Sequence, residues 1–429
     1  MKLPTTPPRG MRDVLPDEVD LRDRTLATIL DVYRRRGFVR IETPAVESLD
    51  LLTRSEGGEN EKLIFKILKR GERLAAARDT EELADLGLRF DLTVPLVRYY
   101  ANNHARLPQP LKAIQIGPVW RAERPQHGRS RQFTQCDIDI LGVRSEVAEI
   151  ELILATADAL SALGLDDLTV RINDRRLLAF LARHCGFEES RFDSVFIALD
   201  KLDKIEAAGV VKELVEDGHP GPAVSALMSL LEASRGTDAT PERLARELGD
   251  ADTPVGRALT RIIETVTEAA GRRFRVAFDP SLVRGMAYYT GPIFEVRHGD
   301  AGASIAGGGR YDRMIGKLLG RDVPATGFSI GFERVINILS GRAGGGVDRQ
   351  ARTAIVFDED TAHLGTVLAM ARDLWDDGRV VSLEIKAKRF GKQLQDLEAR
   401  GFGRVVVVDA EGRARDAELS PQSERERPA

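Results

Sequence analysis

Apolar residues recur with a helical period close to the N-terminus of the chain. Within 21–36 they are spaced i, i+3, i+4 and i+7, which places them on one face of a helix. Gly37 follows this segment, and glycine often ends a helix because it adopts a positive φ at little cost. The apolar face consists of Leu26, Ile29, Leu30 and Tyr33. The pattern predicts an amphipathic helix over 21–36.

Strand-like segments follow this helix at short intervals. The first, 38–44, alternates apolar and polar residues and ends at Pro44, which suits the exit of a strand. Further strands are predicted at 88–92, 113–116, 132–141 and 168–172. Several of these segments are separated by too little chain for the crossover helix that parallel strands need. The spacing favours antiparallel pairing and an α+β fold.

After this region, the pattern of hydrophobic and polar residues changes twice. Helical periods with Gly and Pro breaks fill 177–272, and strand-like patterns resume at Phe274. We interpret 177–272 as a helical insertion in a domain made of 1–176 and 273–340. A glycine-rich stretch at 341–352 is typical of a flexible linker.

The remaining residues, 353–429, predict a small α/β domain. Strand patterns at 353–357, 380–385 and 404–409 alternate with helical patterns at 363–377 and 390–400. Strands that alternate with helices in this way form parallel sheets. The polar tail 411–429 is predicted to be disordered.

Composition and charge narrow the function classes. The chain has 429 residues, 42% of them hydrophobic and 30% charged, which is typical of a folded globular protein. Its formal net charge of −4 means that nucleic acid would have to bind a local basic surface. Two cysteines are too few for a disulfide framework, and no zinc-ligand spacing is present, so no structural metal is expected. Neither a signal peptide nor a membrane span is expected, which favours the cytoplasm.

The most informative stretch is RAERPQHGRSRQFTQ at 121–135, an arginine-rich loop between two predicted strands. Guanidinium groups bind phosphate oxygens in bidentate fashion and stay charged. The loop therefore suits a triphosphate or the end of a nucleic acid. On charge alone, a solvated arginine-rich turn is an equal alternative.

The order of residues in this stretch resembles motif 2 of class II aminoacyl-tRNA synthetases in its histidyl form. A second segment, GFSIGFERV at 327–335, is similar to class II motif 3, although an arginine at a helix start is otherwise often a surface cap. The resemblance implies that Arg121 holds the α-phosphate of ATP, that Phe133 stacks on adenine, and that Glu123 and Arg334 also contact ATP. It implies further that Arg124 and Gln126 face the acceptor end of tRNA.

Three other segments are similar to histidine-specific parts of the family. They are FDLTVP at 90–95, LVRGMAYYTGPIFE at 282–295 and AGGGRYD at 306–312. Taken alone, each segment also has a purely structural explanation. Asp91 and Thr93 could cap a turn, Tyr288 and Tyr289 could pack within a strand, and the three glycines could form a turn. The resemblance assigns histidine binding to Asp91, Thr93, Gln135, Asp139, Arg284, Tyr288, Tyr289 and Tyr311.

Arg284 has a special place in this resemblance. In the family, the matching arginine contacts the reacting α-phosphate where other enzymes use a metal, so Arg121 and Arg284 are the expected catalytic residues. Two positions depart from the commoner pattern: Ala287 stands where many members carry an acid, and Asp139 where many carry the longer glutamate.

The implied activity is histidine–tRNA ligation through a histidyl adenylate. The expected partners are ATP with Mg²⁺, histidine and tRNA(His). The fold implied is the antiparallel sheet of class II synthetases with flanking helices, an anticodon-binding-like domain at 353–429, and a homodimer formed through the region 37–52. Two alternatives stay open: a histidine-sensing regulatory subunit of ATP phosphoribosyltransferase, and a paralogue that adenylates histidine for another acceptor.

Overall fold

A computed structural model describes residues 3, 5–54, 58–79, 82–125, 130–234, 240–248, 254–284, 288–299, 303–342, 352–361 and 363–417. The chain divides into two compact units, 1–341 and 342–429.

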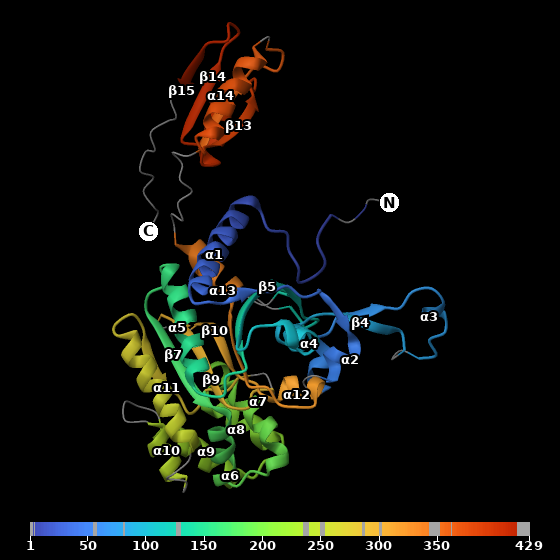
Figure 1. The fold of residues 1–429 in the computed structure, drawn as a ribbon, viewed down its shortest axis with the longest axis vertical. Coiled ribbons are helices and arrows are strands. Elements are labelled where there is room, and N and C mark those ends of the chain that lie inside the picture. The colour runs from blue at the N-terminus through green and yellow to red at the C-terminus, as the bar shows by residue number, and fades with distance from the viewer. Residues whose placement is uncertain are drawn as a thin grey trace. The chain divides into compact units, whose positions relative to one another are not determined.

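The larger unit is built on an eight-stranded sheet with the order β1-β5-β6-β11-β10-β9-β7-β8 (Figure 1). Its strands are β1 (Val39–Arg40), β5 (Leu111–Trp120), β6 (Gln132–Leu141), β7 (Leu168–Asp174), β8 (Arg275–Phe278), β9 (Pro292–His298), β10 (Ala303–Arg310) and β11 (Ala325–Ile330). Neighbouring strands are antiparallel except for the pairs β1–β5 and β7–β8. The predicted α+β class with a mainly antiparallel sheet is confirmed.

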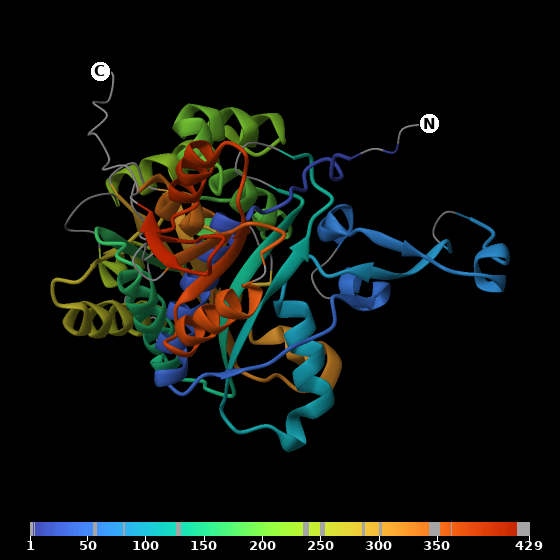
Figure 2. The same ribbon diagram turned by 90° about the horizontal axis from the view of Figure 1, so that it is seen from above.

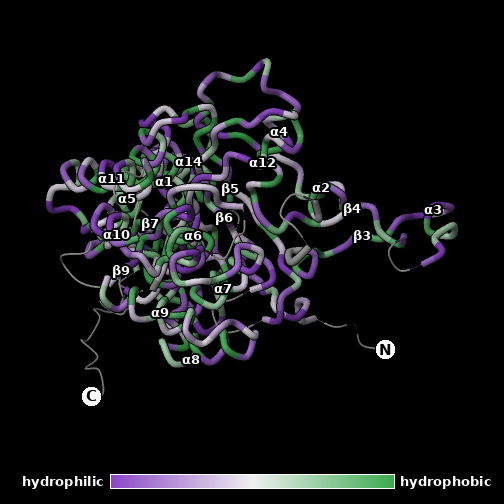
Figure 3. The backbone as a smooth tube through the Cα atoms, turned by 90° about the horizontal axis from the view of Figure 1, so that it is seen from below, coloured by the Kyte–Doolittle hydropathy of each residue, from purple (hydrophilic) through white to green (hydrophobic). Residues whose placement is uncertain are grey.

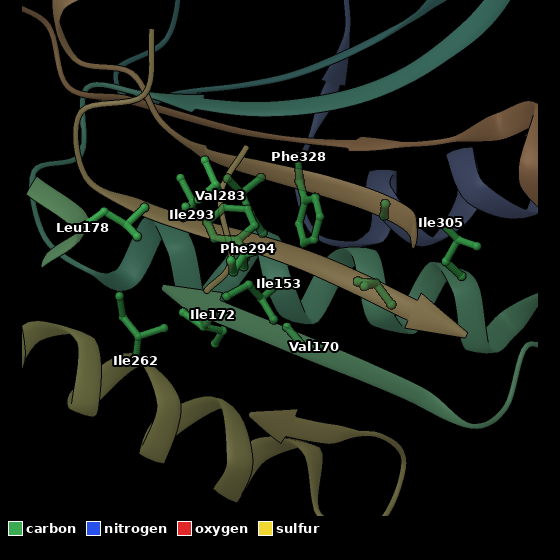
Figure 4. Packing of buried hydrophobic residues seen from close by; sticks show 14 of the residues in the cluster. Ile153, Val170, Ile172, Leu178, Ile262, Val283, Ile293, Phe294, Ile305 and Phe328 are labelled. Atoms are coloured by element: carbon green, nitrogen blue, oxygen red, sulfur yellow. The ribbon is translucent and has the colours of Figure 1, made fainter. Parts of the chain in front are cut away.

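One face of this sheet is covered by four helices, which pack on one another and on the strands. These helices are α1 (Pro16–Arg35), α5 (Val147–Ala162), α11 (Pro254–Ala270) and α13 (Phe332–Gly341). Alternation along β6 turns Cys136, Ile138 and Ile140 into this apolar core. In Figure 4, Phe294 and Phe328 meet above the helix that carries Ile153, with ring centroids 4.6 Å apart. Much of the apolar core therefore lies on this one face.

The opposite face carries a smaller apolar cluster at one end and leaves the centre open. The helices α4 (Thr93–Asn103) and α12 (Arg313–Leu319) pack together there, against Leu111 and Leu141 of the sheet. On this face the middle of β6 carries polar side chains instead of apolar ones. This is where the candidate site lies.

Helices fill the segment between β7 and β8. They are α6 (Arg175–His184), α7 (Phe192–Leu199), α8 (Leu202–Glu216), α9 (Gly221–Ala233), α10 (Pro241–Glu247) and α11. The Asp174 side chain accepts a hydrogen bond from the Arg176 backbone amide, so β7 ends directly in a capped helix. Many apolar residues of these helices are buried in the main core. Figure 3 colours the backbone by hydropathy and shows hydrophobic and hydrophilic stretches alternating along the chain.

A three-stranded sheet extends from this unit as an arm, visible in Figures 1 and 2. It consists of β2 (Val46–Ser48), β3 (Lys66–Leu68) and β4 (Ala84–Leu88), with α2 (Leu49–Arg54) at its base and α3 (Glu72–Ala75) in the β3–β4 connection. Three short 3-10 helices, Gly58–Leu63, His104–Arg106 and Glu189–Arg191, complete the described elements of the unit.

The smaller unit is a four-stranded sheet with the order β13-β12-β14-β15. Its elements are β12 (Arg352–Phe357), α14 (Leu364–Asp376), β13 (Val380–Ile385), α15 (Phe390–Ala399), β14 (Arg404–Val408) and β15 (Ala414–Ala417). The first three strands in this order are parallel, as predicted. Alternate residues of β12 pack under α14 on one face and under α15 on the other.

Several predicted boundaries were wrong. The first helix begins at Pro16, five residues before the apolar period starts, because proline fits the first turn of a helix. The strand predicted at 88–92 is β4, which ends at Leu88. Beyond it, the carboxylate of Asp91 accepts a hydrogen bond from the Val94 amide, and α4 begins. The predicted tail holds β15, which pairs with β14; residues 418–429 and most of the predicted linker lie outside the described residues.

Candidate active site

A cavity of about 670 Å³ opens on the polar side of β6, β10 and β11. All the residues predicted to bind ATP or histidine line it: Asp91, Thr93, Arg121, Glu123, Phe133, Gln135, Asp139, Arg284, Tyr288, Tyr289, Tyr311 and Arg334. The sheet order explains this convergence, since β11 lies between β6 and β10 although it follows both in the chain. Arg124 is exposed and does not line the cavity, and Gln126 lies outside the described residues.

Arg121 lies where β5 ends and the return to β6 begins. Its Nε donates a hydrogen bond to the Phe90 carbonyl at 3.1 Å, and its guanidinium carbon lies 5.0 Å from the ring centroid of Phe133. This contact holds the arginine and the aromatic ring as a cation–π pair. A charged fork beside a flat ring is the arrangement that a nucleotide phosphate and base require.

Arg334 enters the same cavity from the first turn of α13. Its Nη1 donates to the Ser304 carbonyl, which ties the side chain to the start of β10. The neighbouring Glu333 accepts from both guanidinium nitrogens of Arg22, at 2.7 and 2.8 Å, and from the Thr134 amide at 3.1 Å. These bonds fix the start of α13 against β6.

Arg284 lies across the backbone of β10. Its Nη1 donates to Oε2 of Glu295 at 3.0 Å. A Cβ at Gly307 would overlap the guanidinium group, and a Cβ at Gly308 would overlap the carbonyl oxygen of Gly327. The glycines therefore belong to a strand and not to a turn, and they leave room for close approach.

Three carboxylates face the interior of the cavity: Asp91, Asp137 and Asp139, each at most 5% exposed. Tyr311 donates its hydroxyl proton to Oδ1 of Asp139 at 2.6 Å. The pKa of Asp139 is raised to about 7 as the net result of three effects: burial, the largest, raises it, the hydrogen bond from Tyr311 lowers it, and the charge of Asp91 raises it. Burial and the charge of Asp139 raise the pKa of Asp137 well above its usual range.

Aromatic rings enclose this acidic region. The ring of Tyr288 lies edge-on to that of Tyr289, with centroids 4.7 Å apart, and 5.9 Å from that of Tyr311. Tyrosine walls with carboxylates at the base suit a small aromatic group that carries N–H donors.

Sequence reasoning missed several residues of the cavity. Asp137 could have been found, because the two-residue period of β6 places it on the same face as Gln135 and Asp139. Arg171, Asp203, Glu295 and Arg297 also line the cavity. Only the folded structure brings Asp203 next to β7 and β9, and no sequence signal marked it.

Among the described residues, no group of three or more His, Cys, Asp and Glu side chains is arranged to hold a metal ion. None of the described helices combines the length and apolar character needed to cross a bilayer. Ala287 lies outside the described residues.

Comparisons with known proteins agree with this geometry. The sequence profile of the histidyl-tRNA synthetase family matches residues 10–335. The histidine–tRNA ligase of Leifsonia xyli is 47% identical over 99% of this chain and 100% of its own length. That of Aeropyrum pernix is 42% identical over 77% of this chain and 73% of its own. The crystal structure of histidyl-tRNA synthetase from Nostoc sp. PCC 7120 superimposes with a TM-score of 0.77 at 26% identity, covering 97% of both chains. The chain belongs to the histidyl-tRNA synthetase family.

Proposed function

We propose that this protein couples histidine to tRNA(His) in two steps. In the first, the carboxylate of histidine attacks the α-phosphorus of ATP, which forms histidyl adenylate and releases pyrophosphate. In the second, a terminal ribose hydroxyl of the tRNA attacks the activated carbonyl and AMP leaves. The observation that carries this proposal is that Arg121, Arg284 and Arg334 line one cavity together with a buried carboxylate and tyrosine pocket.

The arginines act on the phosphates in this proposal. Arg121 and Arg284 stabilise the negative charge that develops on the α-phosphate, and Arg334 and Glu123 contact the rest of ATP. Phe133, which already packs on Arg121, stacks on adenine. Mg²⁺ would accompany the nucleotide and would be bound chiefly through the phosphates.

The acidic pocket holds histidine. Asp91 and Thr93 receive the α-ammonium group, with Gln135 beside them. Asp139, Tyr289 and Tyr311 surround the imidazole, and Tyr288 supports the other two tyrosines. A carboxyl group with a pKa of about 7 can accept a hydrogen bond from an imidazole N–H when it is ionised.

Transfer RNA contacts follow from the family. Arg124 and Gln126 face the acceptor end, the domain 353–429 contacts the anticodon side, and two chains pair through the region 37–52. In this proposal, residues 177–272 form a helical insertion in the catalytic domain, and residues 341–352 link that domain to the C-terminal one. The protein acts in the cytoplasm.

The regulatory-subunit alternative is not favoured. Such relatives lose the C-terminal domain and the ATP-binding arginines, and this chain keeps Arg121, Arg284 and Arg334 in one cavity as well as a second compact unit. A structure described as an ATP phosphoribosyltransferase regulatory subunit/histidyl-tRNA synthetase from Bacillus halodurans shares the fold, with a TM-score of 0.74 at 24% identity. At that identity the likeness concerns the fold alone.

Exchange of pyrophosphate into ATP, measured over a panel of amino acids, tests the first step. We expect exchange with histidine alone, and a loss of about 100- to 1000-fold in Arg284→Ala. Arg243→Ala is the matched control, because Arg243 lies on α10 in an exposed pair with Glu247. A folded protein without histidine-dependent exchange would refute the proposal.

Charging of tRNA tests the second step. We expect tRNA(His) to be acylated, and Arg124→Ala to slow acylation while leaving pyrophosphate exchange unchanged. Exchange without charging of any tRNA would instead identify the paralogue that uses another acceptor.

A further inference from the structure

The helical insertion contributes directly to the wall of the cavity. Leu199 and Asp200, at the end of α7, and Leu202 and Asp203, at the start of α8, line it together with Arg284. These residues come from a part of the chain to which the family resemblance assigned no catalytic role.

Asp203 joins the insertion to the sheet through two ion pairs. Its Oδ2 pairs with Arg297 of β9, and with Nη1 of Arg171 of β7 at 3.2 Å. The two arginines lie on neighbouring antiparallel strands, and Arg171 is directly opposite Glu295. Three elements, α8, β7 and β9, therefore meet at one carboxylate.

Glu295 continues this network to Arg284. Its Oε1 accepts from Nη1 of Arg171 at 3.3 Å and from Nε of Arg297 at 3.1 Å. Its Oε2 accepts from Nη1 of Arg284 at 3.0 Å. One oxygen of Glu295 thus binds the two arginines that hold Asp203, and the other binds the arginine expected at the α-phosphate.

Each arginine of this network has a carboxylate partner, and the charge of Asp200 also acts on Arg284, where burial lowers the pKa and this charge raises it. Arg171, Arg284 and Arg297 are matched by Asp203, Glu295 and Asp279, the last of which pairs with Arg171. The side chains of Arg171 and Glu295 are 12% and 10% exposed, whereas that of Asp203 is 53% exposed. Loss of Glu295 would remove the carboxylate that Arg171, Arg284 and Arg297 share, and loss of Asp203 would remove the one that Arg171 and Arg297 share. In each variant the remaining side chains would have to rearrange.

The backbone next to Asp203 is strained. Glu206 has φ 57° and ψ 174°, a conformation that is almost confined to glycine, and α8 is kinked there. The kink sets the first turn of α8, which carries Asp203, apart from the rest of the helix. The position of this turn is therefore set by its own contacts, which include the ion pairs of Asp203 with Arg171 and Arg297.

We propose that Asp203 and Glu295 are positioning residues, through which the helical insertion holds Arg284 in the orientation that meets the α-phosphate. The inference rests on the proposed function. A long guanidinium side chain has many rotamers, and its catalytic effect depends on being fixed before the phosphate arrives. The insertion is in this way a structural part of the adenylation site.

The test compares Asp203→Asn and Glu295→Gln with the wild-type protein in histidine-dependent pyrophosphate exchange. We expect kcat to fall about 10- to 100-fold while the KM for histidine changes less than about 3-fold, because misplacing a catalytic group lowers the rate more than it weakens substrate binding. Asp203→Glu should restore most of the rate. Asp203→Asn should cost little more in a chain that already carries Glu295→Gln, since both act through Arg284.

Asp193→Asn is the matched control. Asp193 lies on α7 of the same insertion and pairs with Arg175 at 2.8 Å, but it does not line the cavity. We expect its exchange kinetics to equal those of the wild type. If Asp203→Asn, verified as folded by its urea unfolding midpoint, behaves like this control, the inference is overturned and the proposed function stands. If the wild type itself shows no exchange, the proposed function falls and this inference with it.

Discussion

The guanidinium group of Arg284 lies against the backbone of Gly307, in the space that a Cβ on that residue would occupy. Any side chain on residue 307 would therefore require Arg284 to leave its present position. The arginine in turn is bound on its other side by Glu295 at 3.0 Å.

Gly307→Ala tests this relationship. The added methyl group must displace Arg284, so we expect a loss of about 10- to 100-fold in kcat for pyrophosphate exchange, with a folded protein. Gly221→Ala, at a helical position where a Cβ meets nothing within 4 Å, is the control and should keep full activity. Equal rates in the two variants would show that Arg284 does not need this space.

Asp139 predicts a dependence of stability on pH. Its pKa is raised from 3.8 to about 7 in the folded protein, so the folded state binds a proton that the unfolded state releases between these values. The contribution of Asp139 to the free energy of unfolding is therefore complete below pH 3.8 and is lost as the pH rises through about 7. We expect the free energy of unfolding of the wild type to fall more steeply between about pH 4 and 7 than that of Asp139→Asn, by up to about 1.4 kcal/mol per pH unit.

Urea unfolding of the two proteins across this pH range provides the measurement. The substitution Asp31→Asn, at an exposed ion pair with Arg35, serves as the control and should leave the slope unchanged. Parallel curves for the wild type and Asp139→Asn would contradict the expected burial of a titrating carboxyl group.

Tyr311→Phe removes the hydrogen bond that Asp139 accepts at 2.6 Å. That bond lowers the pKa of Asp139, so the pKa should rise further in the variant. If the ionised carboxylate binds histidine, kcat/KM for histidine should increase with pH through this pKa, and its midpoint should move to higher pH in Tyr311→Phe. Steady-state exchange between pH 6 and 9 measures the shift, with Tyr99→Phe, outside the cavity lining, as the control.

Breaking the buried ion pair between Glu149 and Arg310 should destabilise the protein. Glu149, fully buried on α5, binds Arg310 of β10 through two hydrogen bonds of 2.6 and 2.9 Å. Glu149→Gln removes the closer and more buried of the two carboxylates that pair with the guanidinium and leaves Asp312 at 3.2 Å, which should cost about 3 kcal/mol in the free energy of unfolding. Glu247→Gln, in the exposed pair with Arg243, should cost less than about 1 kcal/mol in the same urea titration. Similar losses would mean that Arg310 is solvated.

The parts of the fold that were predicted correctly have strong local signals. The period of β6 and the strand–helix alternation of the smaller unit follow from side-chain burial, which the sequence records directly. The boundary at Leu88 was misplaced because Phe90 and Leu92 are apolar and buried without belonging to a strand. There the capping carboxylate of Asp91 outweighs the apolar pattern.

The sequence allowed prediction of those cavity residues that lie in recognisable motifs. Arg121 and Arg284 could be assigned because their neighbours in the chain are distinctive. The network of Asp203 and Glu295 could not, because ion pairs between residues 94 positions apart in sequence, such as Asp203 and Arg297, leave no periodic trace. Such ion pairs between distant residues can be identified only in the folded structure.

The central place of β11 has a consequence for protein synthesis. Among the described strands of the main sheet, β11 is the last to be synthesised, and it alone lies between β6 and β10. A nascent chain that has not yet reached Ile330 lacks the strand that joins β6 to β10, so Arg121 and Arg284 cannot yet line one cavity. Chains shortened before Ile330 should therefore be unable to activate histidine.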